Sequence, residues 1–245
     1  EYGESLHRRA EDAGVTLLDG MGFAPGLSNV TLAQAIRQVQ AERAVARVGG
    51  IPNRDSAARH PLQYMITWSF EHVLREYMVD VRIIEEGSIA EVKATSGRES
   101  FRFAECGEDE MLECAITPGM PSFLFTRNQL HSFAEKTIRW PGHWQAIDAL
   151  KDCGLLDIEP ICFCGQELRP RDFFLKVIEL RLMPLPGDED VCVMWNTALG
   201  EEKRADYYMW AEADMANGLS AMARVTGFSA AIAARLLAGG YVKEK

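Results

Sequence analysis

The stretch Val79-Asp-Val-Arg-Ile-Ile-Glu-Glu-Gly-Ser-Ile-Ala-Glu-Val-Lys-Ala94 decides the fold class of this chain. Its apolar residues alternate with polar ones, which predicts two strands joined by a turn at Gly87-Ser88. One face of this hairpin would carry Val79, Val81, Ile83, Ala90, Val92 and Ala94. The alternation continues over residues 101–116, so we expect a meandering antiparallel region.

Residues on either side of this region follow other patterns. A second hairpin is predicted over residues 191–209, with its turn between Gly200 and Lys203. A strand is expected at 45–48 with a loop at 49–53, and a short buried strand at 15–18. Apolar residues at helical spacing predict helices over 5–13, 29–41, 144–153, 217–238 and from 169 onward. Thr31 and Gln34 have the spacing of a capping box. The fold class is therefore α/β (α+β), with a mixed, largely antiparallel sheet and flanking helices.

Composition narrows the functional classes. The chain has 245 residues, 47% of them hydrophobic, enough for a core. Its net charge of -10 argues against nucleic acid as a partner, because phosphate binding needs clustered Lys and Arg. We expect no membrane span, since no apolar run reaches about 18 residues, and no signal peptide at the N-terminus. The expected location is cytoplasmic.

Six cysteines are scattered along the chain, and a protein of this size does not need disulfides to fold. Cys162-Phe-Cys164 is the closest pair. No second Cys or His pair at zinc spacing accompanies it, so we expect reduced thiols and no metal.

Two motifs connect the chain to a known family. They are Ala13-Gly-Val-Thr-Leu-Leu-Asp-Gly-Met-Gly-Phe-Ala-Pro-Gly-Leu-Ser-Asn29 and Ala134-Glu-Lys-Thr-Ile-Arg-Trp-Pro-Gly-His-Trp144. Both resemble signatures of the saccharopine dehydrogenase family, in matching order and separation. The resemblance implies oxidation or reduction of a carbon–nitrogen bond in an amino acid with NAD or NADP. It also implies a fold like the carboxyl-terminal domain of saccharopine reductase.

The nucleotide-binding part of such an enzyme is expected to lie mostly outside this chain. No Gly-x-Gly-x-x-Gly triplet occurs in it, although such a triplet is typical of a dinucleotide site. In the family, the turn formed by Gly22, Pro25 and Gly26 would lie at the mouth of the nicotinamide site. The following helix N-terminus could favour an anionic group there, or Pro25 and Gly26 could simply shape the turn.

His143 and Arg139 are the candidates for chemistry in the second motif. Oxidising a carbon–nitrogen bond requires an uncharged amine, so a group that titrates near neutral pH is useful. His143 could supply it, or could be a capping or surface residue. Arg139 could bind a substrate carboxylate, or could belong to a structural ion pair. The resemblance favours the functional reading of both.

A third stretch, His60-Pro-Leu-Gln-Tyr-Met-Ile-Thr-Trp-Ser69, resembles the loop around the family's substrate pocket. Tyr64 and Trp68 could line that pocket or belong to the core. Saccharopine-reducing members have an Arg shortly after the Trp-Ser pair, where this chain has Phe70-Glu71-His72. Glu71 would repel a carboxylate and would suit an ammonium group, as in lysine dehydrogenases. We expect Arg139, His143, Tyr64 and Trp68 to share one pocket.

The resemblance divides the chain into three parts. Residues 1–29 would be a truncated Rossmann remnant, 30–215 a substrate-binding and dimerisation domain, and 216–245 a closing helix that packs on the nucleotide-binding domain. The predicted function is the carboxyl-terminal part of an NAD(P)-dependent amino-acid dehydrogenase that forms a homodimer. The alternative is a noncatalytic dimerisation or scaffold module. If a partner domain is missing, the apolar faces of residues 15–18 and of the closing helix should be exposed.

Overall fold

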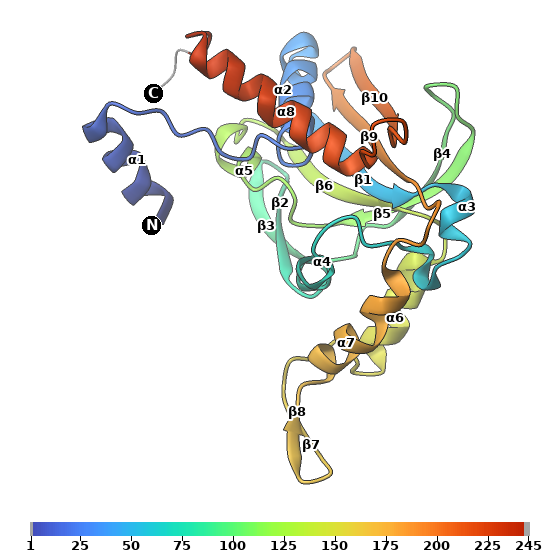
Figure 1. Ribbon diagram of the computed structural model, residues 1–245. Helices are drawn as coiled ribbons and strands as arrows, with labels where there is room; N and C mark the ends of the chain where they lie inside the picture. Colours follow the sequence, from blue (N-terminus) through green and yellow to red (C-terminus); the bar gives the residue numbers. More distant parts are fainter. Residues whose placement is uncertain (1, 243–245) are drawn as a thin grey trace.

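The computed structural model describes residues 2–242, with side-chain surroundings from residue 6 onward. Its centre is an eight-stranded mixed sheet with helices packed on it (Figure 1). The strands of this sheet are β1 (Arg43–Pro52), β2 (Asp80–Glu85), β3 (Ser88–Lys93), β4 (Glu99–Phe103), β5 (Glu110–Ile116), β6 (Ser132–Arg139), β9 (Asp190–Leu199) and β10 (Arg204–Glu212). This arrangement confirms the predicted fold class.

The two central strands, β1 and β6, run parallel, and their neighbours on both sides are antiparallel to them. The order across the sheet is β10-β9-β1-β6-β2-β3, and β5 also pairs with β6 and carries β4. The two hairpins β2–β3 and β4–β5 therefore both join β6. The expectation of a simple meander is wrong, because β3 does not pair with β4 and each hairpin pairs instead with a different part of β6.

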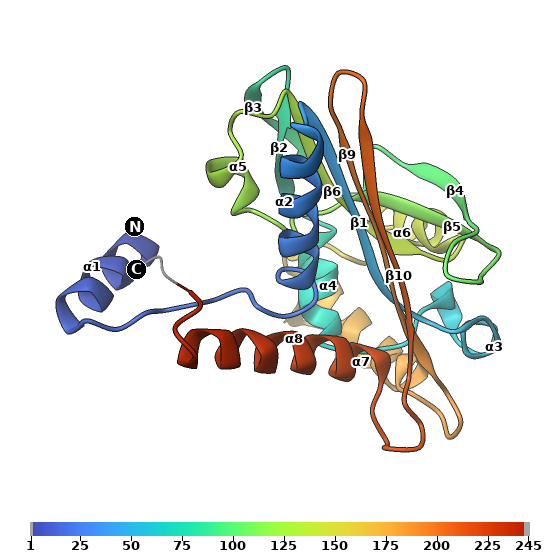
Figure 2. The same cartoon turned by 90° about the horizontal axis from the view of Figure 1, so that it is seen from above.

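Helix α2 (Leu27–Val39) covers one side of the sheet and contacts β9 and β10 (Figure 2). Leu32, Ala35, Ile36 and Val39 recur on one face and are buried against Ala44 and Ala46 of β1. Small residues on the strand let the helix approach closely. The predicted helix is confirmed, but the predicted capping box is wrong. Thr31 lies inside the helix, where its hydroxyl donates to the Leu27 carbonyl over 2.9 Å.

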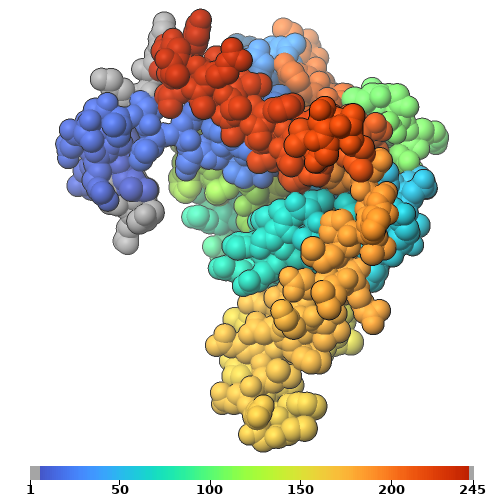
Figure 3. Space-filling view, viewed as in Figure 1, coloured from blue at the N-terminus to red at the C-terminus, as the bar shows by residue number. Residues whose placement is uncertain are grey.

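A helical arm projects from the sheet (Figure 1 and Figure 3). It consists of α6 (His143–Asp152), the hairpin β7 (Ile161–Phe163) and β8 (Gln166–Leu168), and α7 (Pro170–Leu182). Trp144 and Ile147 of α6 and Phe174 of α7 are buried against α4 (Phe70–Glu76). The base of the arm is therefore part of the same core as the short helix that precedes β2.

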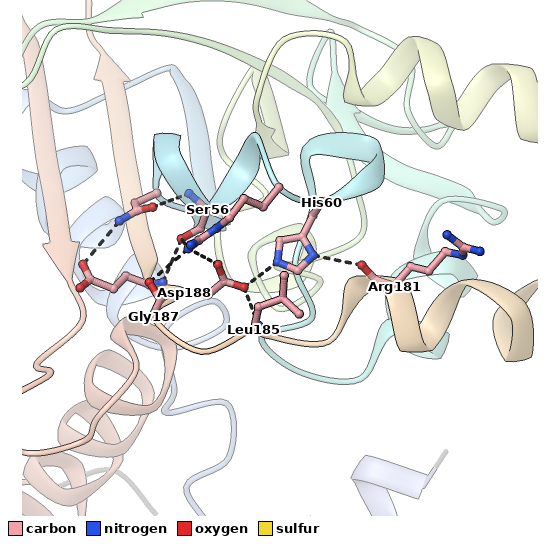
Figure 4. Close-up of polar contacts among 9 residues, drawn as sticks. Ser56, His60, Arg181, Leu185, Gly187 and Asp188 are labelled. Carbon is pink, nitrogen blue, oxygen red and sulfur yellow. Dashed lines mark hydrogen bonds and ion pairs between the residues drawn. The ribbon is translucent and has the colours of Figure 1, made fainter.

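A buried polar cluster fixes the return of the arm to the sheet (Figure 4). His60 Nε2 lies 2.7 Å from Asp188 Oδ2, and His60 Nδ1 lies 3.0 Å from the Arg181 carbonyl oxygen. Both ring nitrogens of His60 therefore face oxygen atoms of the segment that follows α7 or ends it. Burial opposes ionisation of Asp188, but hydrogen bonds from His60 and the Leu185 amide lower the pKa of this carboxyl. The short helix α3 (Arg54–Ala57) also contributes, since Ser56 Oγ accepts from the Glu189 amide over 3.0 Å.

Helix α8 (Ala221–Ala238) closes the described chain and lies against β9 and β10 (Figure 2). It starts four residues later than predicted, because Ser220 caps it through the Ala223 amide. Phe228, Ile232 and Leu236 are exposed on its outer side. By length and composition alone this helix could cross a membrane, and the expected absence of a membrane span stays a prediction.

Two further expectations are wrong. Residues 15–18 form no strand, since no described segment pairs with them, and Val15 and Leu17 are 54% and 60% exposed. They follow α1 (Tyr2–Ala13) as an extended segment.

The expected loop at 49–53 is mostly strand, because β1 continues to Pro52. A Cβ atom on Gly49 would lie 2.6 Å from the Ile138 carbonyl oxygen, so glycine permits the close pairing of β1 and β6.

Candidate functional site

Arg139 ends β6 and is almost fully buried, with 5% of its surface exposed. Its Nε donates to Tyr77 Oη over 3.0 Å, and its Nη1 donates to the Ile138 carbonyl over 2.9 Å. The guanidinium carbon lies 5.2 Å from the centre of the Tyr64 ring. Among the described residues, no carboxylate lies within 4 Å of the guanidinium and no hydrogen bond involves Nη2. Arg139 therefore forms no ion pair with the described residues, although a structural ion pair was the alternative role expected for it.

Tyr77 connects Arg139 to His143. Its hydroxyl oxygen accepts from Arg139, and its O–H faces His143 Nε2 at 3.3 Å. His143 Nδ1 lies 2.9 Å from the Leu62 carbonyl oxygen, which can only accept, so Nδ1 carries the proton. Nε2 is then the acceptor from Tyr77. All these contacts are satisfied when the His143 imidazole is neutral and carries its proton on Nδ1.

The electrostatics of His143 differ from what its motif suggested. The side chain is fully buried, and burial together with the nearby Arg139 charge lowers its pKa to about 3. The imidazole is therefore neutral throughout the physiological range. This shift opposes the expected titration near neutral pH, and its causes, burial and the neighbouring Arg139, are not visible in the motif itself.

Tyr64 lies under the same arginine. Its ring centre is 5.7 Å from that of His143, and its side chain is fully buried. Within residues 6–242 its hydroxyl has no hydrogen-bond partner. Burial of the hydroxyl raises the pKa of Tyr64. A buried hydroxyl without a hydrogen-bond partner thus lies near a guanidinium without a carboxylate partner.

Trp68 and Glu71 lie apart from this cluster. Trp68 is 42% exposed and stacks on His72, with ring centres 6.4 Å apart. Glu71 is exposed in the first turn of α4. The structure thus brings together three of the four residues expected in one pocket, namely Arg139, His143 and Tyr64. Trp68 occupies the outside of the same loop.

The loop from Gly22 to Gly26 is closed on itself. The amide of Leu27 donates to the Gly22 carbonyl and that of Ser28 to the Phe23 carbonyl, both over 2.9 Å. The Gly26 amide donates to Asn29 Oδ1. These amides are the ones that an anion at the start of α2 would use, so the expected anion site is not available there. Gly26, at φ 140°, shapes the turn, since a Cβ atom would collide with Gly22.

Tyr77 was missed from the sequence, and it is the residue that links the cluster. It caps the C-terminus of α4 and lies outside the motifs that suggested function. Its signal was weak, since a tyrosine near apolar residues usually belongs to a core.

The described residues contain no group of three His, Cys, Asp or Glu that could hold a metal. Cys162 and Cys164 are exposed in the β7–β8 hairpin.

Comparison with known proteins agrees with this architecture. The family model of the saccharopine dehydrogenase C-terminal domain matches residues 22–245. The chain belongs to this family. Alpha-aminoadipic semialdehyde synthase of Bos taurus, a mitochondrial protein, is 23% identical, over 99% of this chain and 34% of its own length. The NADP-dependent, L-glutamate-forming saccharopine dehydrogenase of Pyricularia oryzae is 23% identical, over 71% of this chain and 40% of its own length.

A solved structure has the same fold. Apo saccharopine dehydrogenase (L-Glu forming) from Saccharomyces cerevisiae superposes with a TM-score of 0.74 at 16% identity, covering 95% of this chain and 68% of the yeast chain. This chain spans about a third of the bovine relative and two fifths of the Pyricularia relative. The family and the fold are thereby established.

Proposed function

We propose that this chain provides the substrate-binding and self-association part of an NAD(P)-dependent oxidoreductase that acts on the carbon–nitrogen bond of an amino acid. One observation carries the proposal: Arg139 is buried, charged and without a carboxylate partner among the described residues. Family membership supplies the reaction class, since its similar proteins include saccharopine dehydrogenases.

An unpaired buried guanidinium favours an anionic ligand. Removing a charge from water costs several kcal/mol unless a counter-charge and hydrogen bonds offset it. Tyr77 Oη and backbone carbonyls satisfy part of the Arg139 donor set. The carboxylate of an amino acid would complete it, and the unpartnered Tyr64 hydroxyl is placed to add a second donor.

In this proposal Tyr77 and His143 position Arg139 and Tyr64 for the substrate. The pKa of about 3 keeps His143 neutral, so it adds no second positive charge beside the guanidinium. It can still accept a hydrogen bond from Tyr77 at any pH at which enzymes normally operate. We therefore assign His143 a positioning role in place of the acid–base role expected from its motif.

A nicotinamide cofactor would accept or deliver the hydride when bound. The described residues do not fit its phosphates, since the amides of the Gly22–Gly26 loop are engaged in the loop itself. NAD or NADP would therefore be held mainly by protein outside this chain. Gly22 lies near Thr226 on α8, so this loop and the start of α8 form one surface, against which we propose that the nucleotide-binding part packs.

The test is steady-state turnover of the full-length protein with an amino-acid substrate and NAD or NADP. Arg139→Lys keeps the charge but loses the Nε donor to Tyr77, and Arg139→Met loses both. Losing a charge-assisted contact costs about 1.5–3 kcal/mol, which corresponds to about 10- to 150-fold in kcat/KM. Trp68→Phe, at the exposed edge of the loop, is the matched control. Full activity of Arg139→Met would refute the substrate role of Arg139.

The second candidate function is a noncatalytic dimerisation or scaffold module of the same ancestry. The exposure of Phe228, Ile232 and Val15 favours it, since apolar side chains in such positions suit a partner surface. The two functions differ in one measurement. A scaffold would self-associate in sedimentation experiments but would bind no amino acid in calorimetry, and Arg139→Met would leave both results unchanged.

A further inference from the structure

The helical arm exposes much of the apolar surface of this chain (Figure 3). Among residues 6–242, 24 large apolar side chains are exposed, and nine of them lie in the 31 residues from 155 to 185. A large apolar residue has about 200 Å² of surface and these are about half exposed, so the arm shows on the order of 900 Å² of them. An apolar surface of this extent marks a contact with another molecule.

Helix α7 is apolar on two sides. Phe174 and Leu182 are buried in the core at the base of the arm. Phe173, Val177 and Leu180 recur at the spacing of one helix face, and they are 54%, 51% and 81% exposed. We call these three residues the outer stripe. A helix at the surface of a protein normally carries polar residues on its outer side, so a second apolar stripe indicates a second packing contact.

The β7–β8 hairpin, which leads into α7, also lacks a packing partner. It is a two-stranded sheet separate from the central sheet, and a two-stranded hairpin is only marginally stable by itself in water. Ile161 and Phe163 are two residues apart on β7 and therefore lie on the same face of the hairpin. They are 51% and 62% exposed. Covering this face would stabilise the hairpin by removing apolar surface from water.

The charge of the arm favours a second copy of this chain as the partner. Residues 155–185 include five acidic and four basic residues, a net charge of -1, so the rest of the chain carries -9 of the total of -10. Two copies of a chain with this charge repel each other over most of their surface, but not where two arms meet. Lys176 and Glu179 of α7 lie 3.9 Å apart, so both signs of charge are present beside the outer stripe.

The extent and position of the surface also fit a second copy. A stable interface takes about 800 Å² from each partner, close to what the arm exposes. A two-fold axis would bring the outer stripes of two copies together, and such an interface uses the same patch on both. The arm projects from the sheet, so two arms can meet at their outer sides without a contact between the two sheets (Figure 1).

We propose that the outer stripe of α7 is an interface with the same stripe of a second copy of this chain, with the β7–β8 hairpin at its edge. The inference rests on the self-association part of the proposed function and assigns a surface to it. The three residues of the stripe belong neither to the Arg139 cluster nor to α8. Changing them should therefore alter assembly without removing a substrate contact.

The test is the mass of the full-length protein by sedimentation equilibrium. Val177→Glu places a charge in the middle of the outer stripe, where association would remove it from water, so the Kd of self-association should rise at least about 30-fold. Between the two Kd values, the assembly formed by the variant should have half the mass. Ile232→Glu is the matched control, since Ile232 is 57% exposed on α8, and its mass should not change. An unchanged Kd for Val177→Glu would overturn the interface.

A second variant keeps the fold of the single chain. The side chains of Val177 and Leu180 are mostly in water, and Ala has the highest helix propensity, so the double variant Val177→Ala, Leu180→Ala should fold at least as well as the unaltered chain. Circular dichroism below the Kd checks this. The double variant should self-associate about tenfold more weakly or worse, because it removes apolar area from the interface. An unchanged Kd would overturn the proposal.

The outcomes separate this inference from the proposed function. If Ile232→Glu halves the mass and Val177→Glu does not, the arm interface is overturned and self-association through α8 stands. If Val177→Glu lowers Tm without changing the mass, another part of the longer protein covers the stripe, and the second copy is overturned. A full-length protein that is monomeric at every concentration overturns self-association and the arm interface together, while the turnover of Arg139→Met still decides the catalytic part.

Discussion

The attachment of α8 to the sheet should depend on Asp190, a buried residue at the start of β9. Its Oδ1 accepts from the Ala221 amide over 2.6 Å and its Oδ2 from the Met222 amide over 2.9 Å. These amides belong to the first turn of α8, where no carbonyl within the helix can accept from them. Asp190 is 2% exposed and Ala221 is fully buried, so water does not replace the carboxylate easily.

The cost of Asp190→Asn can be worked out from these contacts. One amide keeps an oxygen acceptor, while the other faces the new NH₂ group and is left unsatisfied, at a cost of about 1–3 kcal/mol. Loss of the negative charge at the helix N-terminus costs a further amount of about 0.3–1 kcal/mol. The sum, about 1.5–4 kcal/mol, would lower Tm by about 3–16 °C for a chain of this size.

Thermal unfolding followed by circular dichroism measures this change, with Ser220→Ala as the matched control. Ser220 caps the same helix through the Ala223 amide, and removing such a cap costs about 1 kcal/mol. Hydrogen exchange of α8 should accelerate before that of β9, because few side chains of the helix are buried. If Asp190→Asn is no more destabilising than Ser220→Ala, the buried carboxylate does not hold the helix.

Three further predictions follow from other contacts. The pKa of Asp188 is lowered in the folded chain, so its stabilising effect is present above about pH 4 and is lost as the pH falls through the folded pKa. Urea unfolding from pH 7 to pH 2 should show this loss of stability, and Asp188→Asn should make the loss smaller. Gly119→Ala should destabilise the chain by about 1–3 kcal/mol in the same assay, because the new methyl group would meet the Glu135 carboxyl, and a neutral result would show that the loop can move. The full-length protein should turn over lysine faster than saccharopine at equal concentration if Glu71, exposed and apart from the Arg139 cluster here, reaches the substrate in the complete enzyme, and faster turnover of saccharopine would remove Glu71 from the argument.

Local patterns in the sequence predicted the elements whose stability depends on their own residues. The β9–β10 hairpin is confirmed because Val191 and Val193 alternate with polar or smaller side chains and a turn follows at Gly200. Helix α2 is confirmed by its single apolar face. The strand predicted at 15–18 is wrong, since an apolar run becomes a strand only where another strand offers hydrogen bonds. Among the described residues, none does.

The residues of the candidate site could be predicted where they belong to short motifs, but not where their role arises from contacts formed on folding. Arg139 and His143 were found because they belong to one short motif, and Tyr64 because it belongs to another. Tyr77 was not found, because the contact that gives it a role arises only when α4 packs on β6. Glu135 was not found either, since a glutamate in a strand usually faces water. Its burial depends on the loop at Gly119, which no local pattern foretells.

Burial, more than motif membership, therefore decides which of these groups can do chemistry. His143 is in the motif, yet burial beside Arg139 lowers its pKa to about 3 and makes it a fixed hydrogen-bond acceptor. Burial of Glu135 raises its pKa to about 8, against the lowering effect of its hydrogen bonds and of the Arg139 charge, so this carboxyl changes charge near neutral pH. The group whose pKa lies in the range useful for amine chemistry is thus Glu135, outside the predicted site, and not the histidine of the motif.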